Sequence, residues 1–436
     1  MNRFGLRKAV VRDFALAVTV MAGTLGAFGS ALLLEHLAHQ GLGLVILTVV
    51  LALSLGRRPR ATVRDGLPDL VVVPLIALGA AELSLLLFDH PDVGDAAVAV
   101  LLGATFWARR FGGWIARVAA LALLPVTATL VAPTIGLGLT PSARWWELAA
   151  GGLAVVWVRV AQALAARCGV GIQQSTAVQA SRGVAARWGV HDRMALQLGL
   201  AVGLALVIGR VWFPLHWNWA ALTATIVCSA GPSRGEVALK GLSRLLGAAV
   251  GTLVAAALSA HFPGHRSETV VIIFVLLFLG SWGRQQLYAV WAGCMTCVMA
   301  LLSGYLGVPG STVLGQRLLA IALGAACAMV VCAFVVPTTT TRMVQRRRGA
   351  VVLAERDLAQ ALNPPSIDLS RRLATYEQRL IELDRALRPL QVGHVLVRHV
   401  HPVDSEVVGQ ANKVLARAAP LRDSALGVLQ GRTDLK

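Results

Sequence analysis

The residues with the strongest chemical character in this chain are charged side chains inside long apolar segments. Glu82 is an acid well inside one such segment, and Arg159, Arg210 and Arg317 lie in three others. A charge at the centre of a bilayer costs at least about 2.5–3.5 kcal/mol on insertion scales, so such residues usually face a bundle interior or water. They are candidates for a pathway that moves an ion or a charged solute.

Each of these residues has a second interpretation. A carboxyl group such as Glu82 suits proton coupling, but a salt bridge to an arginine, or a side chain that reaches the membrane surface, explains it equally well. Arg159 can extend to the surface in the same way. Arg317 precedes a long run of small residues, and a permanent, forked guanidinium there suits carboxylate recognition.

Motifs of catalysis and cofactor binding are not found in the sequence. It has no GxSxG, HExxH or nucleotide-binding loop, and the stretch after Gly231 departs from the GxxxxGK[ST] pattern. Cys294 and Cys297 have CxxC spacing but no polar neighbours, so we interpret them as buried small apolar residues. We expect no enzyme activity, no cofactor and no metal.

Composition indicates an integral membrane protein. Of the 436 residues, 56% are hydrophobic and 14% are charged, against about 25% charged in ordinary soluble domains. The net charge of +18 would suggest nucleic acid in a soluble protein. In a membrane protein, an excess of Lys and Arg in cytoplasmic loops explains it, so the expected partner is the lipid bilayer and not nucleic acid.

The apolar segments predict an all-α polytopic bundle of about twelve membrane spans, since a spanning helix needs about 20 apolar residues. The expected spans are 14–34, 39–56, 68–88, 94–108, 114–133, 145–166, 194–213, 217–231, 242–262, 268–283, 286–306 and 312–336. Basic residues gather at the N-terminus and in alternate loops, which places both termini in the cytoplasm. At the cytoplasmic ends, this rule is also the plainest explanation of Arg109, Arg244 and Arg284.

An internal repeat is visible at an offset of 175 residues. Residues 52–67 align with 227–242 without gaps, and Trp107-Ala108-Arg109 aligns with Trp282-Gly283-Arg284. Six spans in each half is an even number, so the halves would be parallel repeats, and transporters often bind substrate between repeats. The expected organisation is a six-span half (1–166), a cytoplasmic linker (167–193), a second six-span half (194–337) and a cytoplasmic helical domain (338–436).

The last hundred residues contain an apolar seam with coiled-coil spacing. Its members are Leu373, Tyr376, Leu380, Leu383, Leu387 and Leu390, and Pro389 is expected to end it. The seam fits a helix that packs on neighbours within its own chain, or a contact between the two chains of a homodimer.

One segment of the second half resembles the fusaric acid resistance (FUSC) family. The residues that carry the resemblance are a Trp that opens a helix, a Leu-Thr-Ala element, a Gly-containing turn, an Arg-x-x-Gly-x-x-x-Gly helix and a later Arg before a Gly/Ala-rich run. They are Trp219, Leu222, Thr223, Ala224, Gly231, Arg244, Gly247, Gly251, Arg317 and Gly324. The family includes aromatic acid exporters and is similar to aluminium-activated malate transporters.

The resemblance implies a multi-pass transporter of the plasma (bacterial cell) membrane that exports aromatic or other organic acids. On this interpretation Arg244 and Arg317, with Trp219 and Thr223 of the motif, contact a small organic anion. Two alternatives remain. A major-facilitator-type carrier also has two parallel halves, although Gly56 and the residues after it lack the Asp of its loop motif. A membrane scaffold would not transport at all.

Overall fold

The computed structural model describes most of the chain as α-helix, and within the described residues there is no strand. It describes residues 3–38, 42–56, 68–130, 144–168, 189–231, 233–261, 267–284, 287–305, 313–336, 340–362, 368–396 and 402–433. The chain divides into two compact units. The first holds α1 to α8, α9 from Lys240 onward, and α10 to α12 as far as Val331.

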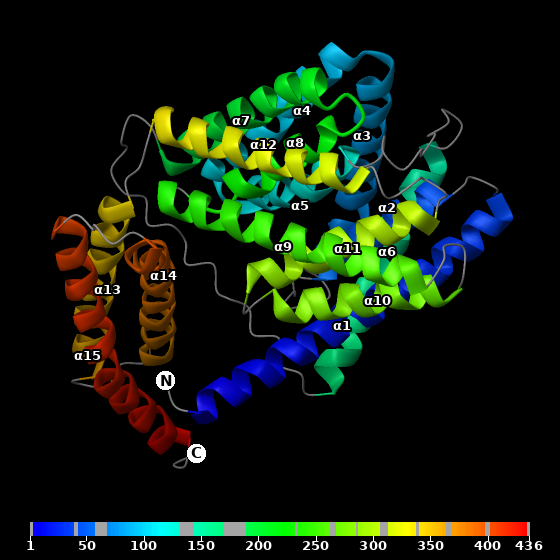
Figure 1. Cartoon of the computed structure of the whole chain (residues 1–436). Coiled ribbons are helices and arrows are strands. Elements are labelled where there is room, and N and C mark those ends of the chain that lie inside the picture. Colours follow the sequence, from blue (N-terminus) through cyan, green and yellow to red (C-terminus); the bar gives the residue numbers. More distant parts are fainter. Residues whose placement is uncertain are drawn as a thin grey trace. The chain divides into compact units, whose positions relative to one another are not determined.

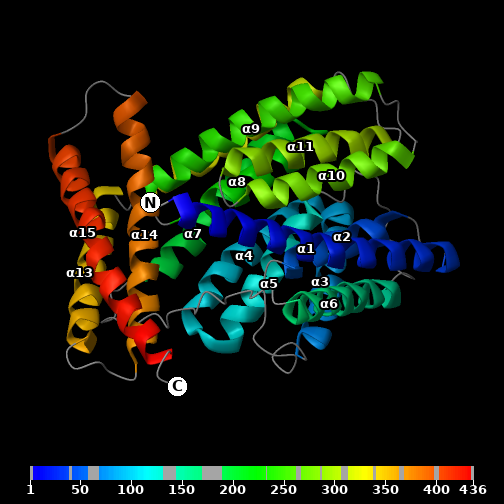
Figure 2. The same cartoon turned by 90° about the horizontal axis from the view of Figure 1, so that it is seen from below.

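In the described part of the chain, twelve helices, of which α9 and α12 also extend into the second unit, each overlap one expected apolar segment, although α1 begins eleven residues before its segment (Figures 1 and 2). They are α1 (Arg3–Ala38), α2 (Leu42–Gly56), α3 (Asp69–Asp89), α4 (Pro91–Trp107), α5 (Gly113–Thr129), α6 (Arg144–Arg167), α7 (Val190–Trp212), α8 (Trp217–Cys228), α9 (Arg234–His261), α10 (Ser267–Gly283), α11 (Tyr288–Tyr305) and α12 (Val313–Phe334).

Among the described residues, seven segments are long and apolar enough to cross a membrane: Asp13–Leu37, Asp69–Asp89, Leu148–Arg167, Val190–Trp212, Arg234–Ser259, Tyr288–Tyr305 and Gly315–Phe334. Leu44–Gly56, Gly113–Thr129 and Glu268–Gly283 are shorter apolar helices. α8 has only 12 residues, which is about 18 Å of helix, well short of a hydrocarbon core of about 30 Å.

The helices of the first unit pack through small apolar residues. α1, α2, α3, α5 and α6 share one core, in which Ala27, Leu51, Ala77 and Ala154 are almost completely buried. α4 packs on α7, and α1 packs on α10. Around α8, a further cluster joins Trp219 to residues of α9 and α12.

Helix α9 begins eight residues earlier than the span expected over 242–262, because a capping box starts it. The Ser233 hydroxyl donates to the Glu236 carboxylate (3.0 Å) and the Ser233 backbone N–H donates to it as well (3.2 Å). The Glu236 N–H in turn donates to the Ser233 hydroxyl (3.3 Å). This Ser-x-x-Glu arrangement satisfies exposed N–H groups of the first helical turn. The polar stretch after Cys228 is therefore a short connection followed by a capped helix.

The second unit includes Gly231–Leu239 and Cys332–Lys436. Its helices α13 (Thr340–Leu362), α14 (Leu369–Leu396) and α15 (Pro402–Thr433) pack on one another as three neighbours (Figures 1 and 2). The first turn of α9 is attached to this unit, since the Gly235 N–H donates to the Thr340 hydroxyl (3.1 Å) and Arg234 donates to the Ala333 carbonyl.

The apolar seam of α14 packs against the other helices of this unit. Leu373, Tyr376, Leu383 and Leu387 are buried in a core made with α13 and α15, and Leu380 and Leu390 pack against it. The expected end of the seam helix at Pro389 is wrong, because Pro389 lies inside α14, which continues to Leu396.

Candidate functional site

Arg317 and Trp219 form the centre of the candidate site. Arg317 is near the start of α12 and Trp219 is near the start of α8. The guanidinium carbon of Arg317 lies 4.3 Å from the centroid of the Trp219 ring, which is a cation–π geometry. The two residues are only 4% and 2% exposed, so the sequence has placed a permanent charge and a large aromatic ring together in the interior.

The hydrogen-bonding groups of this centre are donors without acceptors. Arg317 Nη2 lies 3.5 Å from Ser303 Oγ, at the limit of a hydrogen bond. Its Nε and Nη1, and the indole Nε1 of Trp219, have no partner among the described residues. An unsatisfied buried donor costs about 1–3 kcal/mol, and more when it is charged. An acceptor-only group such as a carboxylate would satisfy all three.

Thr223 adds a fourth polar group one helical turn beyond Trp219, on the same face of α8. It is fully buried, and its hydroxyl has no partner within the described structure. Other buried threonines, such as Thr225 and Thr296, donate to the backbone carbonyl four residues earlier. Thr223 does not, so its hydroxyl is available to a ligand.

His216, which precedes α8, also faces this charge. Burial lowers the pKa of His216, and the positive charge of Arg317 lowers it further. The imidazole is therefore neutral at neutral pH, so it adds no positive charge to that of Arg317.

Glycines set the positions of the helices around the site. A Cβ on Gly324 of α12 would lie 2.1 Å from the carbonyl oxygen of Ala220 on α8, so only glycine fits there. Gly247 and Gly251 of α9 approach the backbone of α11 in the same way, at the Ala289 and Gly293 carbonyls. Close helix packing at small residues is typical of membrane bundles.

Arg244 is the other deeply buried arginine of the family-like motif. It is 3% exposed, and its Nε has no partner in the described part of the chain. It lies on α9, two residues after Leu242. Arg284 follows α10, with its guanidinium carbon 5.3 Å from the centroid of Trp291. The structure does not join these two residues to Arg317 by any direct contact that we observe in the described residues.

Arg210 and Arg159 are paired with acids. The Nε and Nη2 atoms of Arg210 donate to the two carboxylate oxygens of Asp95 on α4 at 2.5 and 2.7 Å. Arg159 donates to Asp69, which is buried at the start of α3, and to Gln162. A paired buried charge serves packing as readily as transport, and loss of one partner would leave the other uncompensated.

Glu82 and Arg109 belong to elements of the first half of the chain, α3 and the segment after α4. Glu82 is half-buried on α3 and interacts with other groups. Arg109 belongs to the short 3₁₀ segment Ala108–Phe111, with its guanidinium carbon 4.0 Å from the Phe106 ring centroid. Their roles in a substrate pathway stay predictions.

Several residues of these arrangements were not singled out from the sequence. They are the acids Asp69 and Asp95, and the neighbours of the cations, Ser303, His216, Lys240 and Tyr288. Asp95 is the second residue of the apolar segment expected over 94–108, which was an available signal for an ion pair. Ser303 and Tyr288 are ordinary residues in apolar helices, so only the fold identifies them.

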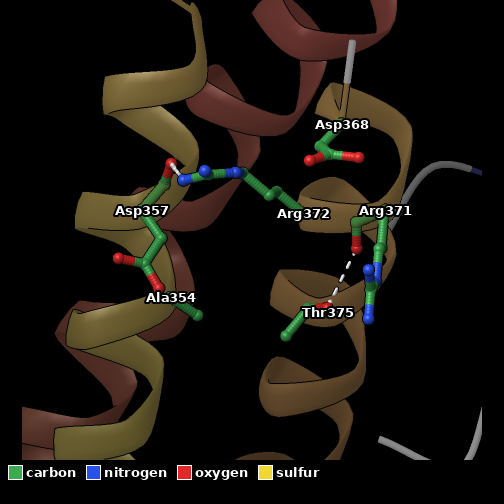
Figure 3. A pocket seen from close by; sticks show the side chains of 6 residues that line it. All are labelled: Ala354, Asp357, Asp368, Arg371, Arg372 and Thr375. Carbon is green, nitrogen blue, oxygen red and sulfur yellow. Dashed lines mark hydrogen bonds between the residues drawn. The ribbon is translucent and has the colours of Figure 1, made fainter. Parts of the chain in front are cut away.

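The second unit has a pocket between α13 and α14, with a volume of about 430 Å³ (Figure 3). Its lining carries both signs of charge: Asp357 and Asp368 with Arg371 and Arg372. Arg372 donates to the backbone carbonyl of Asp357 (3.1 Å). The acids and arginines balance one another, and three of the four are exposed, so this lining has no excess charge of either sign.

Comparison with known families now adds to this geometry. Residues 200–331 match the family model described as fusaric acid resistance protein-like. Together with the seven helices of membrane-spanning length among the described residues, this match fits a multi-pass membrane protein of the transporter class. The match over segment 200–331 confirms the resemblance seen in the sequence. That segment contains both Trp219 and Arg317.

The similarity to malate transporters stays a prediction. No curated protein and no solved structure matches the chain.

Proposed function

We propose that this protein is a transporter of small organic anions, with aromatic acids as the cargo that the site suits best. The observation that carries the proposal is the buried Arg317 guanidinium over Trp219, with donors that have no acceptor in the described residues. A carboxylate would accept from the guanidinium, and the aromatic body of the cargo would contact apolar and ring surface. The family of residues 200–331 supports transport over the scaffold and the major-facilitator alternatives.

The proposed architecture is two parallel six-span halves. α2 and α8 begin at Leu42 and Trp217, and α5 and α11 begin at Gly113 and Tyr288. Both pairs are separated by 175 residues, which is the offset of the sequence repeat. The contacts of α4 with α7 and of α1 with α10 support the same relation, because α1 corresponds to α7 and α4 to α10, so the repeat converts one contact into the other. α8 is short, and short helices in such repeats often border the substrate site.

We further propose export across the plasma membrane, with both termini in the cytoplasm. The basic residues near the N-terminus and after span twelve support this orientation. No catalytic role is proposed for any residue of the chain.

Substitutions of Arg317 test the proposal. Arg317→Lys keeps the positive charge but loses the planar set of N–H donors of the guanidinium group, so it should weaken binding of benzoate. Arg317→Ala should weaken it further, by roughly ten- to a hundred-fold in affinity, since a charged hydrogen bond contributes about 1.5–3 kcal/mol.

The measurement is benzoate affinity on purified, folded protein, followed by efflux of labelled benzoate from cells that express each variant. Arg117→Gln is the matched control, because it removes an exposed cation of α5 from the same protein. Wild-type affinity in Arg317→Ala would exclude this residue from cargo binding. Benzoate efflux equal to that of cells without the protein would refute the transport proposal.

A further inference from the structure

A second group of cations surrounds the other end of α8. Lys240 Nζ lies 3.4 Å from the hydroxyl of Ser229, which caps the C-terminus of α8, and 5.3 Å from the centroid of the Tyr288 ring. Arg244 and Arg284 both act electrostatically on the Tyr288 hydroxyl and on Lys240. Three positive side chains from α9 and the end of α10 therefore converge on one tyrosine of α11.

These cations have no acid to balance them within the part of the chain that the structure describes. Arg159 and Arg210 are each matched by a carboxylate, whereas Lys240, Arg244 and Arg284 are in no ion pair. Instead they meet a hydroxyl and the aromatic rings of Tyr288 and Trp291, which carry no net charge. Like charges that approach without a counter-ion repel one another, and the repulsion is larger away from water.

We propose that Lys240, Arg244 and Arg284 form an oxyanion-binding site, with the Tyr288 hydroxyl as a further donor. Two guanidinium groups and an ammonium present many N–H donors and no acceptor. This chemistry fits a carboxylate, sulfate or phosphate group. Arg244 is 3% exposed, and its Nε has no partner in the described chain, so part of its donor capacity is open to a ligand.

The site is distinct from the one at Arg317. Trp219 and Ser229 are ten residues apart on α8, which corresponds to about 15 Å along the helix axis. Thr223, with its unpartnered buried hydroxyl, lies between them in the sequence of α8. The second site binds an oxyanion whether or not the protein transports one, so it does not depend on the proposed function.

Labelled sulfate is the probe for this site, measured by scintillation proximity on the purified full-length chain in a non-ionic detergent. We expect sulfate affinity to fall roughly ten-fold or more in Lys240→Gln and in Arg244→Gln. Lys240→Arg should retain binding because it keeps the charge. Arg117→Gln should bind as the wild type does.

Thermal unfolding of each variant identifies those that remain folded, and the pair Lys240→Gln and Lys240→Arg decides the test if Arg244→Gln does not fold. No sulfate binding by the wild type, or wild-type binding in Lys240→Gln and Arg244→Gln, would overturn the proposal.

Nanodiscs distinguish two sources of the oxyanion. Sulfate binding that is equal in nanodiscs with and without phosphatidylglycerol supports a soluble anion as the natural occupant. Sulfate binding that phosphatidylglycerol displaces, and that depends on Lys240, supports a lipid headgroup phosphate at the same site.

Discussion

At the residue scale, some buried or half-buried cations of the first unit are paired with an acid and others are not. Arg159 and Arg210 pair with acids 90 and 115 residues away in the sequence. Arg317 pairs with a ring and a hydroxyl. The sequence showed each arginine in an apolar segment but could not show which had a partner, because the partners come from distant helices. This distinction is what separates residues that stabilise the bundle from candidates for binding.

The protonation of His216 gives a prediction at the same scale. Because its pKa is lowered in the folded protein by burial and by Arg317, the unfolded chain takes up a proton at a higher pH than the folded chain does. Stability is therefore lost as the pH falls below about 6.5, the ordinary value for histidine. His216→Asn should make the unfolding temperature of the purified protein less sensitive to pH between about pH 7 and pH 5.

The control for this prediction is His90→Asn, since His90 is exposed at the start of α4. That variant should keep the pH dependence of the wild type. An unfolding temperature in His216→Asn that falls with acidification as steeply as in the wild type would contradict the assignment.

At the scale of the elements, the sequence predicted the helices of the first unit well and their ends less well. Long apolar runs between polar segments fix where a helix lies, because every backbone group in a bilayer must be hydrogen-bonded internally. The start of α9 was missed because Arg234 and Lys240 are polar, while the capping box of Ser233 and Glu236 decides where that helix begins. Pro389 was expected to break α14, and tertiary packing with α13 and α15 overrides it.

The contact of α8 with α12 makes a sharp prediction for Gly324. In Gly324→Val the new side chain would overlap the Ala220 carbonyl, which a Cβ would approach to 2.1 Å. Overpacking of this kind typically costs about 1–3 kcal/mol or more, and here it would also displace Trp219 from Arg317. We expect a lower unfolding temperature and weaker benzoate binding.

Gly315→Ala is the matched control on the same helix. A Cβ there meets nothing within 4 Å, and alanine is the better helix former by about 0.5–1 kcal/mol. That variant should be at least as stable as the wild type. Equal stability of Gly324→Val and Gly315→Ala would show that α8 and α12 are not in close contact.

The seam of α14 makes a second prediction at this scale. Leu383 is fully buried in the core of the second unit, so Leu383→Ala should destabilise that unit by about 2–5 kcal/mol. Ile381→Ala, at an exposed position of the same helix, should have little effect. Limited proteolysis of the tail helices across a denaturant series measures both.

This result also bears on the homodimer interpretation of the seam. Its most apolar side chains are already used within the chain, so a charged substitution at Leu383 would unfold the unit before it tested an association. A dimer, if it forms, needs another surface, and sedimentation of the folded Ile381→Ala control would detect one. Equal protease resistance of Leu383→Ala and wild type would contradict the core described for this unit.

At the scale of the whole molecule, the proposed repeat separates two roles. Under the offset of 175 residues, Arg244 corresponds to Asp69 and Arg284 to Arg109. The first half therefore has an acid, paired with Arg159, where the second half has an unbalanced arginine. The two halves therefore carry opposite charges at this position. This difference fits the proposal that the first half stabilises the bundle and the second half binds anions. The offset comes from the sequence, and the ion pairs show that the two halves differ in charge balance at this position.

The orientation of the whole chain is the last prediction. The excess of basic residues in alternate loops places α13 in the cytoplasm and the connection of α3 to α4 outside. Gln345 and Asp92 are exposed positions in these two places. In a variant without the six native cysteines, a cysteine at position 92 should react with an impermeant maleimide added to whole cells. A cysteine at position 345 should react only after the cells are opened.

Exposed positions are essential to this test. Ser233 lies in the polar stretch before α9 but is buried in its capping box, so a cysteine there would resist the reagent from either side. Labelling of both variants after permeabilisation is the control for folding and access. Reaction at position 345 in intact cells, with protection at position 92, would reverse the orientation.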